Sequence, residues 1–326
     1  MRKVHLFAWA IVLFLTAVFA VWAQQSGHQT SVRTDPPVNF NAVAILRWYQ
    51  ANQITSFAVG NNPYGVAFDG TSMWVVNRGD NTVTKLQASD GAVLGTFAVG
   101  SEPHGVAFDG ANIWVANYAD NTVTKLRASD GAVLGTFAVG THPIGVAFCG
   151  IYIWVTNYGS NTVTKLRVAD GKVLGNFSVG SSPFGVAFDG NHIWVANSGS
   201  NNVSELRPRD GKVLGTFTVG SNPVGVAVDG PDIWAANSGS NSVTKLRASD
   251  GTVLGTYATG TQPYGVAFDG ANIWVANAGS NNVTMLRASD GKALGTFAVG
   301  NSPFAAAFDG ANIWVTNSGS NSVAKR

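Results

Sequence analysis

The sequence predicts an all-β protein: a seven-bladed β-propeller of four-stranded antiparallel blades, closed by pairing of its N- and C-terminal strands. From residue 61 it repeats every 40 residues without a gap, a period typical of propeller blades or helical arrays. Each copy is rich in glycine and β-branched residues, contains proline and has no helical 3.6-residue stripe. Charged residues make up only 12% of the chain, which also disfavours a helix bundle.

Each copy divides into four short apolar runs that we expect to be strands. In residues 101–140 these runs are GVAF, IWVAN, TVTKLR and VLGTFAV. Asp-Gly pairs follow the first and third runs, and this pair favours the positive φ angles of tight hairpin turns. A loop of the Gly-Ser-Asn type separates the second run from the third. Four antiparallel strands in 40 residues correspond to one propeller blade.

The two ends of the repeat region predict how the ring closes. Residues 46–60 align with 126–140 without a gap, so the chain begins with the last strand of a blade. The seventh copy, from residue 301, stops before that strand. The propeller is therefore expected over 41–326, with both termini sharing one blade, and closure would hide the sheet edges. Segments 41–46 and 321–326 fall in the same register, so one of them must be displaced.

Residues 1–23 have the pattern of a secretory signal peptide. Arg2 and Lys3 precede an apolar run over 6–23, and Val21-Trp22-Ala23 suits a cleavage site. An uncleaved membrane anchor is the alternative, although the run is slightly shorter than the ~20 residues of a spanning helix. Residues 24–40 are polar, contain a proline pair and are predicted to be a linker. The expected location is outside the cytoplasm, in the periplasm or at the cell surface.

The charge balance excludes several partners. The chain has 20 Lys and Arg against 18 Asp and Glu, and removing Arg2 and Lys3 leaves 18 against 18. A neutral domain lacks the positive surface of a nucleic-acid binder. Cys149 is the single cysteine, so no disulfide forms within the chain. We expect a monomer with no nucleic-acid partner and no membrane contact beyond the N-terminal segment.

The second and third strands carry a family resemblance. The motif IWVTNYGSNTVTKL at 153–166, with its copies, resembles the YVTN family of seven-bladed propeller repeats, and the blades are similar to NHL repeats and virginiamycin B lyase-like propellers. The resemblance covers 41–326 and implies a secreted or surface scaffold. The lyase and gluconolactonase relatives imply a metal-dependent site at one end of the channel. The run 167–177 resembles quinoprotein blades, but Gly175 replaces their tryptophan, so a quinone cofactor is not expected.

Positions that recur in every copy have structural explanations. The second strand always contains a tryptophan, expected to pack between blades: Trp74, Trp114, Trp154, Trp194, Trp234, Trp274 and Trp314. It always ends in an asparagine, expected to bond backbone groups of the following loop: Asn77, Asn117, Asn157, Asn197, Asn237, Asn277 and Asn317.

Positions that depart from the repeat gather on one face. Strand order puts the loops after the second and fourth strands on the same side of the ring, here called the top face. The residues that stand out there come mainly from the first three blades and from a ring around the channel mouth. The candidate ligand-binding residues are Tyr64, Arg78, Asp80, Glu102, His104, Tyr118, Asp120, His142, Tyr158, Phe184, Tyr264 and Phe304.

Four of these residues could bind a metal. Asp80, Glu102, His104 and Asp120 offer carboxylate and imidazole ligands for a divalent cation, calcium or magnesium, which is the only cofactor suggested. The alternative is ordinary variation on a solvated face, with Asp80 and Asp120 capping their loops. Convergence of the four side chains to within a few Å would separate the two interpretations.

The leading functional interpretation is an exported scaffold without catalysis, which binds a protein, glycan or small molecule on the top face. No residue is assigned a catalytic role, and the Gly-x-Ser-x-Gly, His-Glu-x-x-His and phosphate-loop motifs are missing from the sequence. The alternative is a metal-dependent lyase or lactonase, with Glu102, His104 or His142 as metal ligands or acid–base groups. A third interpretation is an envelope building block without a ligand.

Overall fold

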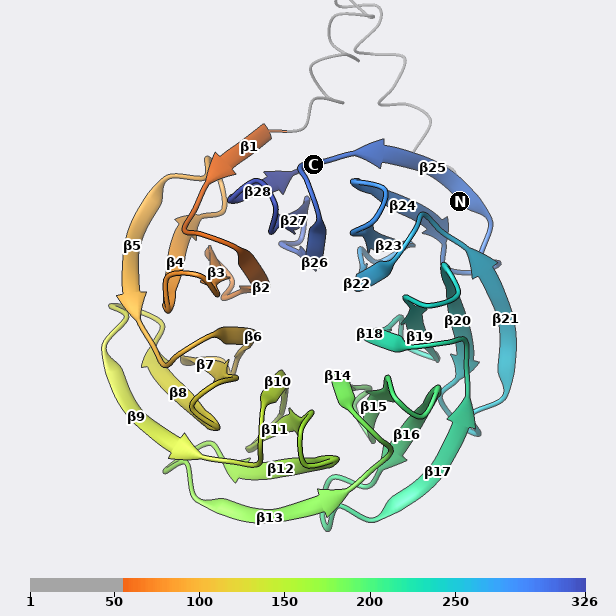
Figure 1. The fold of residues 1–326 in the computed structure, drawn as a ribbon, viewed down its shortest axis with the longest axis horizontal. Helices are drawn as coiled ribbons and strands as arrows, with labels where there is room; N and C mark the ends of the chain where they lie inside the picture. The colour runs from red at the N-terminus through yellow and green to blue at the C-terminus, as the bar shows by residue number, and fades with distance from the viewer. Residues whose placement is uncertain (1–54) are drawn as a thin grey trace, which may run out of the picture. The chain divides into compact units, whose positions relative to one another are not determined.

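The computed structural model describes residues 55–326, which form 28 strands in seven four-stranded sheets around a central channel (Figure 1). Within each sheet all neighbouring strands are antiparallel. The predicted seven-bladed β-propeller is therefore confirmed. The predicted signal peptide, the linker and segment 41–46 lie outside the described residues.

The strands occupy four positions between the channel and the outer rim. The innermost are β2 (Pro63–Phe68), β6 (Pro103–Phe108), β10 (Pro143–Cys149), β14 (Pro183–Phe188), β18 (Pro223–Val228), β22 (Pro263–Phe268) and β26 (Pro303–Phe308). The second are β3 (Ser72–Asn77), β7 (Asn112–Asn117), β11 (Tyr152–Asn157), β15 (Ile193–Asn197), β19 (Asp232–Asn237), β23 (Asn272–Asn277) and β27 (Ile313–Asn317). The third are β4 (Thr82–Gln87), β8 (Thr122–Arg127), β12 (Thr162–Arg167), β16 (Asn202–Leu206), β20 (Ser242–Arg247), β24 (Asn282–Arg287) and β28 (Ser322–Lys325). The outermost are β5 (Val93–Ala98), β9 (Val133–Ala138), β13 (Val173–Ser178), β17 (Val213–Thr218), β21 (Val253–Ala258), β25 (Ala293–Ala298) and β1 (Thr55–Ala58).

Both ends of the chain build the seventh blade. The sheet order β1-β28-β27-β26 places the N-terminal strand on the outside of three C-terminal strands. Thr55 lies opposite Lys325, and Ala58 lies opposite Ser322. The sequence places segments 41–46 and 321–326 in the same register of this blade. The C-terminal segment is the one that forms its third strand, β28.

The hydrophobic core lies between neighbouring blades. Trp74 is fully buried and packs with Ile113 and Leu126 of the next blade. Trp314 of the last blade packs in the same way with Met73 of the first, which continues the core around the ring. The predicted packing role of the tryptophans is confirmed.

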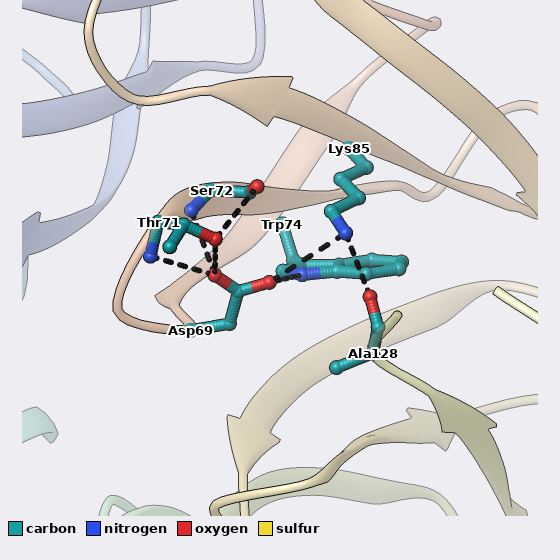
Figure 2. Close-up of polar contacts among 6 residues, drawn as sticks. All are labelled: Asp69, Thr71, Ser72, Trp74, Lys85 and Ala128. Carbon is teal, nitrogen blue, oxygen red and sulfur yellow. Dashed lines mark hydrogen bonds and ion pairs between the residues drawn. The ribbon is translucent and has the colours of Figure 1, made fainter. Parts of the chain in front are cut away.

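In five of the seven blades a polar contact beside the second-strand tryptophan joins the blade to the next one, and Figure 2 shows it in the first blade. Asp69, in the turn after β2, accepts a hydrogen bond from Trp74 Nε1 at 2.8 Å. Lys85 Nζ lies 5.1 Å from the centre of the Trp74 ring and donates to the carbonyl of Ala128 in the next blade at 2.7 Å. We call this contact, from a third-strand lysine to the next blade, the lysine bridge. It ties each blade that has it to its neighbour by a charge-assisted hydrogen bond.

The asparagine that ends the second strand has different partners from those expected. Asn77 Nδ2 donates to the hydroxyls of Thr82 and Thr84 on the third strand, and its Oδ1 accepts from the N–H of Gly60. The expectation of bonds to the following loop is wrong, because the side chain points across the hairpin and not along it.

The inner strands approach one another closely. A Cβ added to Gly65 would lie 2.5 Å from the carbonyl oxygen of His104 in the next blade. Glycine is therefore required there to keep the channel narrow. Within residues 55–326 there is no helix long and apolar enough to cross a membrane.

Candidate functional site

The top face is built from two segments of each blade. After β3 the chain returns to the residues that precede β2, so Arg78 N donates to the carbonyl of Asn62 at 3.1 Å. In the second blade Tyr118 N donates to the carbonyl of Glu102 at the same distance. The two variable segments of each blade thus lie side by side, which brings most of the candidate residues to one surface.

Aromatic rings gather over the mouth of the channel. The Tyr64 ring lies 4.7 Å from the imidazole of His104 and 3.9 Å from the Phe304 ring, measured between ring centres. Phe304 also lies 5.0 Å from Tyr264 and 6.3 Å from Phe184. These five side chains come from five different blades, so together they narrow the channel mouth.

His104 is the buried polar group of this cluster. Its side chain projects from β6, and the residue is 8% exposed. Burial and the nearby charge of Arg78 lower the pKa of His104 to about 3. The imidazole is therefore neutral at pH 7. Its Nδ1 is buried and has no hydrogen-bond partner among residues 55–326.

Arg78 and Glu102 form an ion pair between the first two blades. The Arg78 guanidinium also lies 5.3 Å from the centre of the Tyr64 ring, so it contacts an aromatic face as well as a carboxylate. Glu102 adopts a left-handed backbone with φ of 49°. Because the two charges cancel, the pair supplies donors and acceptors without a net charge.

Tyr118 packs against two imidazoles. Its ring stacks on His142 with 4.4 Å between centres and 10° between planes. The ring also lies 5.1 Å from His104, at an angle of 33° between planes. Tyr118 therefore links the mouth residue His104 to His142 of the third blade.

These side chains surround a hollow on the top face, which we call the top hollow. It is lined by Tyr64, Arg78, His104, Tyr118, Ile144, Tyr158 and Phe184. Six of these residues were candidates from the sequence. Ile144 was not, because an aliphatic side chain in the mouth ring gives no chemical signal. Tyr264 and Phe304 line the channel pocket instead, together with His104 and Phe184.

The other four candidates do not line the top hollow. Glu102 and His142 contact its lining residues Arg78 and Tyr118, whereas Asp80 and Asp120 bind loop amides. Asp80 Oδ2 accepts from the backbone N–H of Asn61, and Asp120 Oδ2 accepts from that of Ser101, both at 2.6 Å. In the fourth blade the hydroxyl of Ser200 makes the equivalent contact. Asp80 and Asp120 therefore cap loops, as the alternative interpretation of the sequence proposed.

The four candidate metal ligands do not converge. Asp80 and Asp120 hold loop amides, Glu102 faces Arg78, and His104 is buried among aromatic rings. No group of three or more His, Cys, Asp or Glu side chains in residues 55–326 could hold a metal ion. The predicted calcium or magnesium site is thus wrong for these residues, because the loop amides and an arginine engage the carboxylates.

Comparison with known families and curated proteins gives a partial match and one negative result. A family model described as outer membrane protein assembly factor BamB matches residues 159–312, which is less than half of the chain. A search of the curated proteins found no match. The resemblance to YVTN and NHL repeats therefore rests on the sequence motif at 153–166 and its copies alone.

Two solved structures share the architecture. One is a hydrazine synthase from Kuenenia stuttgartiensis, with a TM-score of 0.72 and 20% identity, covering 81% of this chain and 95% of the other. The other is a streptogramin B lyase, with a TM-score of 0.72 and 19% identity, covering 84% of this chain and 96% of the other. The likeness is one of fold. At such identities it does not carry activity from one protein to another.

Proposed function

We propose that this protein is an exported binding scaffold whose top hollow receives a saccharide. The observation that supports binding best is the convergence on this hollow of six candidate residues from the first four blades, four of which, Arg78, His104, Tyr118 and Tyr158, depart from the later blades. Drift on a solvated face would scatter such departures around the ring. Here they line a single concave surface, as ligand sites commonly do.

The chemistry of the top hollow suits a ring with apolar faces and polar edges. Tyr64, Tyr158 and Phe184 offer aromatic carbon, and the tyrosine hydroxyls and the Arg78 guanidinium offer hydrogen-bonding groups. The Arg78–Glu102 pair is neutral overall, and so is His104. A neutral saccharide matches this mixture of aromatic surface and hydrogen-bonding groups better than a strongly charged ligand.

Export is the second part of the proposal. The N-terminal run with its basic start supports it, and the family described as an outer membrane protein assembly factor matches part of the chain. Both point toward the cell envelope, either the periplasm or the cell surface. We propose a monomer, because ring closure pairs the strands of all seven blades within one chain.

Binding is a better proposal than catalysis. The lyase interpretation uses Glu102, His104 or His142 as metal ligands or acid–base groups, yet Glu102 pairs with Arg78 and His142 stacks on Tyr118. No arrangement in residues 55–326 favours that chemistry over binding.

A saccharide array tests the proposal. The mature protein is compared with Tyr158→Ser, which installs the serine found at the same position in blades four, five and seven. We expect wild-type protein to retain at least one oligosaccharide and the variant to lose at least tenfold in affinity. Equal binding by both proteins, or binding by neither, would reject a saccharide site in the top hollow.

A further inference from the structure

The lysine bridges lie toward the face of the ring opposite the top hollow. The fourth blade lacks this bridge. The third-strand lysine is present in five blades, as Lys85, Lys125, Lys165, Lys245 and Lys325. Met285 takes its place in the sixth blade, and Glu205 takes its place in the fourth. The substitution by glutamate reverses the charge at a residue that is only 8% exposed.

In the five blades that have a lysine bridge, the lysine ammonium occupies the equivalent position between two blades. In the first blade Lys85 Nζ donates to the carbonyl of Ala128, 43 residues later, at 2.7 Å. Lys125 and Lys245 make the same contact at the same sequence distance and length. Each ammonium also lies over a tryptophan, between 5.0 and 5.2 Å from the ring in these three blades. In the first blade the turn aspartate is 3.9 Å from the ammonium.

The fourth blade keeps the acceptors of that cation. Trp194 is fully buried, and Asp189 Oδ2 accepts from its indole N–H at 2.7 Å. The carbonyl of Ala248 lies 43 residues after Glu205 in the sequence, and among residues 55–326 no hydrogen bond to it is formed. The aromatic face, the carboxylate and the carbonyl therefore remain, and Glu205 adds a second carboxylate.

His192 faces these carboxylates. Its Nδ1 lies 3.0 Å from Glu205 Oε1 and 3.8 Å from Asp189 Oδ2, and its side chain is 32% exposed. Burial raises the pKa of Glu205, as does the nearby Asp189, while His192 lowers it. A protonated imidazole would supply the charge that the lysine supplies elsewhere.

A surface hollow opens at this junction between the fourth and fifth blades. Its lining includes Asp189, His192, Asp232, Arg247 and Ala248. Asp232 is paired with Lys245 at 2.8 Å, and Arg247 is paired with Asp250 at 3.0 Å. Those two pairs are neutral. Among the lining residues, Asp189 is the carboxylate without a lysine or arginine partner, and Glu205 adds a second such carboxylate in contact with the lining residue His192. The hollow therefore favours a positive ligand.

We propose that this hollow binds a primary ammonium group, either of a small amine or of a lysine side chain from a partner. The ammonium would take the position that the lysine ammonium takes in the five intact bridges, donating to the Ala248 carbonyl and to Asp189 and Glu205. His192 contacts the same carboxylates and therefore competes with the ammonium for them. The site lies on the face opposite the top hollow and does not depend on the saccharide proposal.

The test measures the melting temperature of the mature protein at pH 8 against methylammonium chloride. Tetramethylammonium chloride, which has no N–H donor, controls for ionic strength. We expect a saturable rise of about 2–4 °C at tenfold excess over Kd with methylammonium alone. An equal rise with both salts would overturn the proposal.

Two variants locate the effect. Glu205→Lys restores the residue of the other blades, so it should melt higher without amine and show no response to methylammonium. His192→Asn, which copies Asn112 and Asn272, should respond more strongly than wild type. If Glu205→Lys fails to fold, the His192→Asn result decides. Unchanged responses in the variants, or an equal, Glu205-dependent rise with potassium or calcium, would reject an ammonium site.

Discussion

The indole N–H of Trp154 faces the thiol of Cys149, where the other six blades provide an aspartate carboxylate. In those blades the tryptophan donates to the aspartate at 2.7–2.8 Å, as Trp114 does to Asp109. Trp154 Nε1 is buried and has no hydrogen-bond partner within residues 55–326. One substitution in the repeat has thus left a buried donor unsatisfied, which is a cost in stability.

Replacing Cys149 by aspartate should repair this contact. Cys149→Asp supplies an acceptor for Trp154 Nε1. It also supplies a counter-charge for Lys165, because burial lowers the pKa of this lysine. We expect the free energy of unfolding to rise by about 1–2 kcal/mol in urea denaturation. Cys149→Ser, which adds no charge, serves as the control. A lower free energy of unfolding for Cys149→Asp would show that burying the carboxylate costs more than these contacts return.

Loss of one lysine bridge should weaken the ring. Lys125→Met, which copies Met285 of the sixth blade, removes the hydrogen bond to the Val168 carbonyl and the contact with Trp114. The expected loss is about 1–3 kcal/mol by urea unfolding, because the partly buried Val168 carbonyl loses a charged donor and Trp114 loses its cation contact. The exposed pair Arg127–Asp130 provides the control, since Arg127→Gln should cost less than about 1 kcal/mol. Equal losses in the two variants would contradict the bridge.

Stability should depend on pH through His104. Its pKa is lowered to about 3 in the folded protein, so between this value and the ordinary 6.5 the unfolded chain binds a proton that the folded chain does not. The contribution of His104 to the free energy of unfolding is fully present above pH 6.5. It is lost as the pH falls, by up to about 1.4 kcal/mol per pH unit. His104→Phe, which copies Phe184 and Phe304, should flatten the profile measured between pH 3.5 and 7. The control His142→Asn should leave the His104 contribution in place. Parallel profiles for wild type and His104→Phe would refute a buried neutral imidazole at residue 104.

Export makes a prediction about the N-terminus. When the full chain is expressed in a bacterial host, cleavage after Ala23 should give a periplasmic protein that begins at Gln24, because the Val21-Trp22-Ala23 sequence suits signal peptidase. Intact mass measurement of the periplasmic fraction checks this. A full-length protein found in the membrane fraction would instead support the anchor interpretation.

The fold was predictable because each local signal occurs several times. The Asp-Gly turns, the four runs and the terminal alignment all led to the same ring, and the N-terminal strand pairs with β28 as expected. The asparagine contacts were not predictable, since they depend on which way one amide points across a hairpin. The lysine bridges were also missed, because a lysine in a strand gives no indication of a carbonyl in the next blade.

The sequence located residues of the candidate site better than it indicated their chemistry. Comparison of the copies located Arg78, Tyr118 and Tyr158, since each replaces a residue that other blades share. The same comparison could not distinguish a ligand carboxylate from a loop cap, so Asp80 and Asp120 were grouped with the metal candidates. That distinction requires the position of the backbone amides they bind.

The most direct test of the account compares saccharide binding by wild type with that of a triple variant. Arg78→Ser, Tyr118→Ser and Tyr158→Ser together convert the loops after the second strand in the first three blades to the serine found in blades four, five and seven. A matched control, Ser198→Ala with Ser238→Ala and Ser318→Ala, changes the same position in those later blades. By calorimetry with an oligosaccharide selected on the array, we predict loss of binding in the triple serine variant and unchanged affinity in the control. Equal affinity in all three proteins would contradict a ligand site in the top hollow.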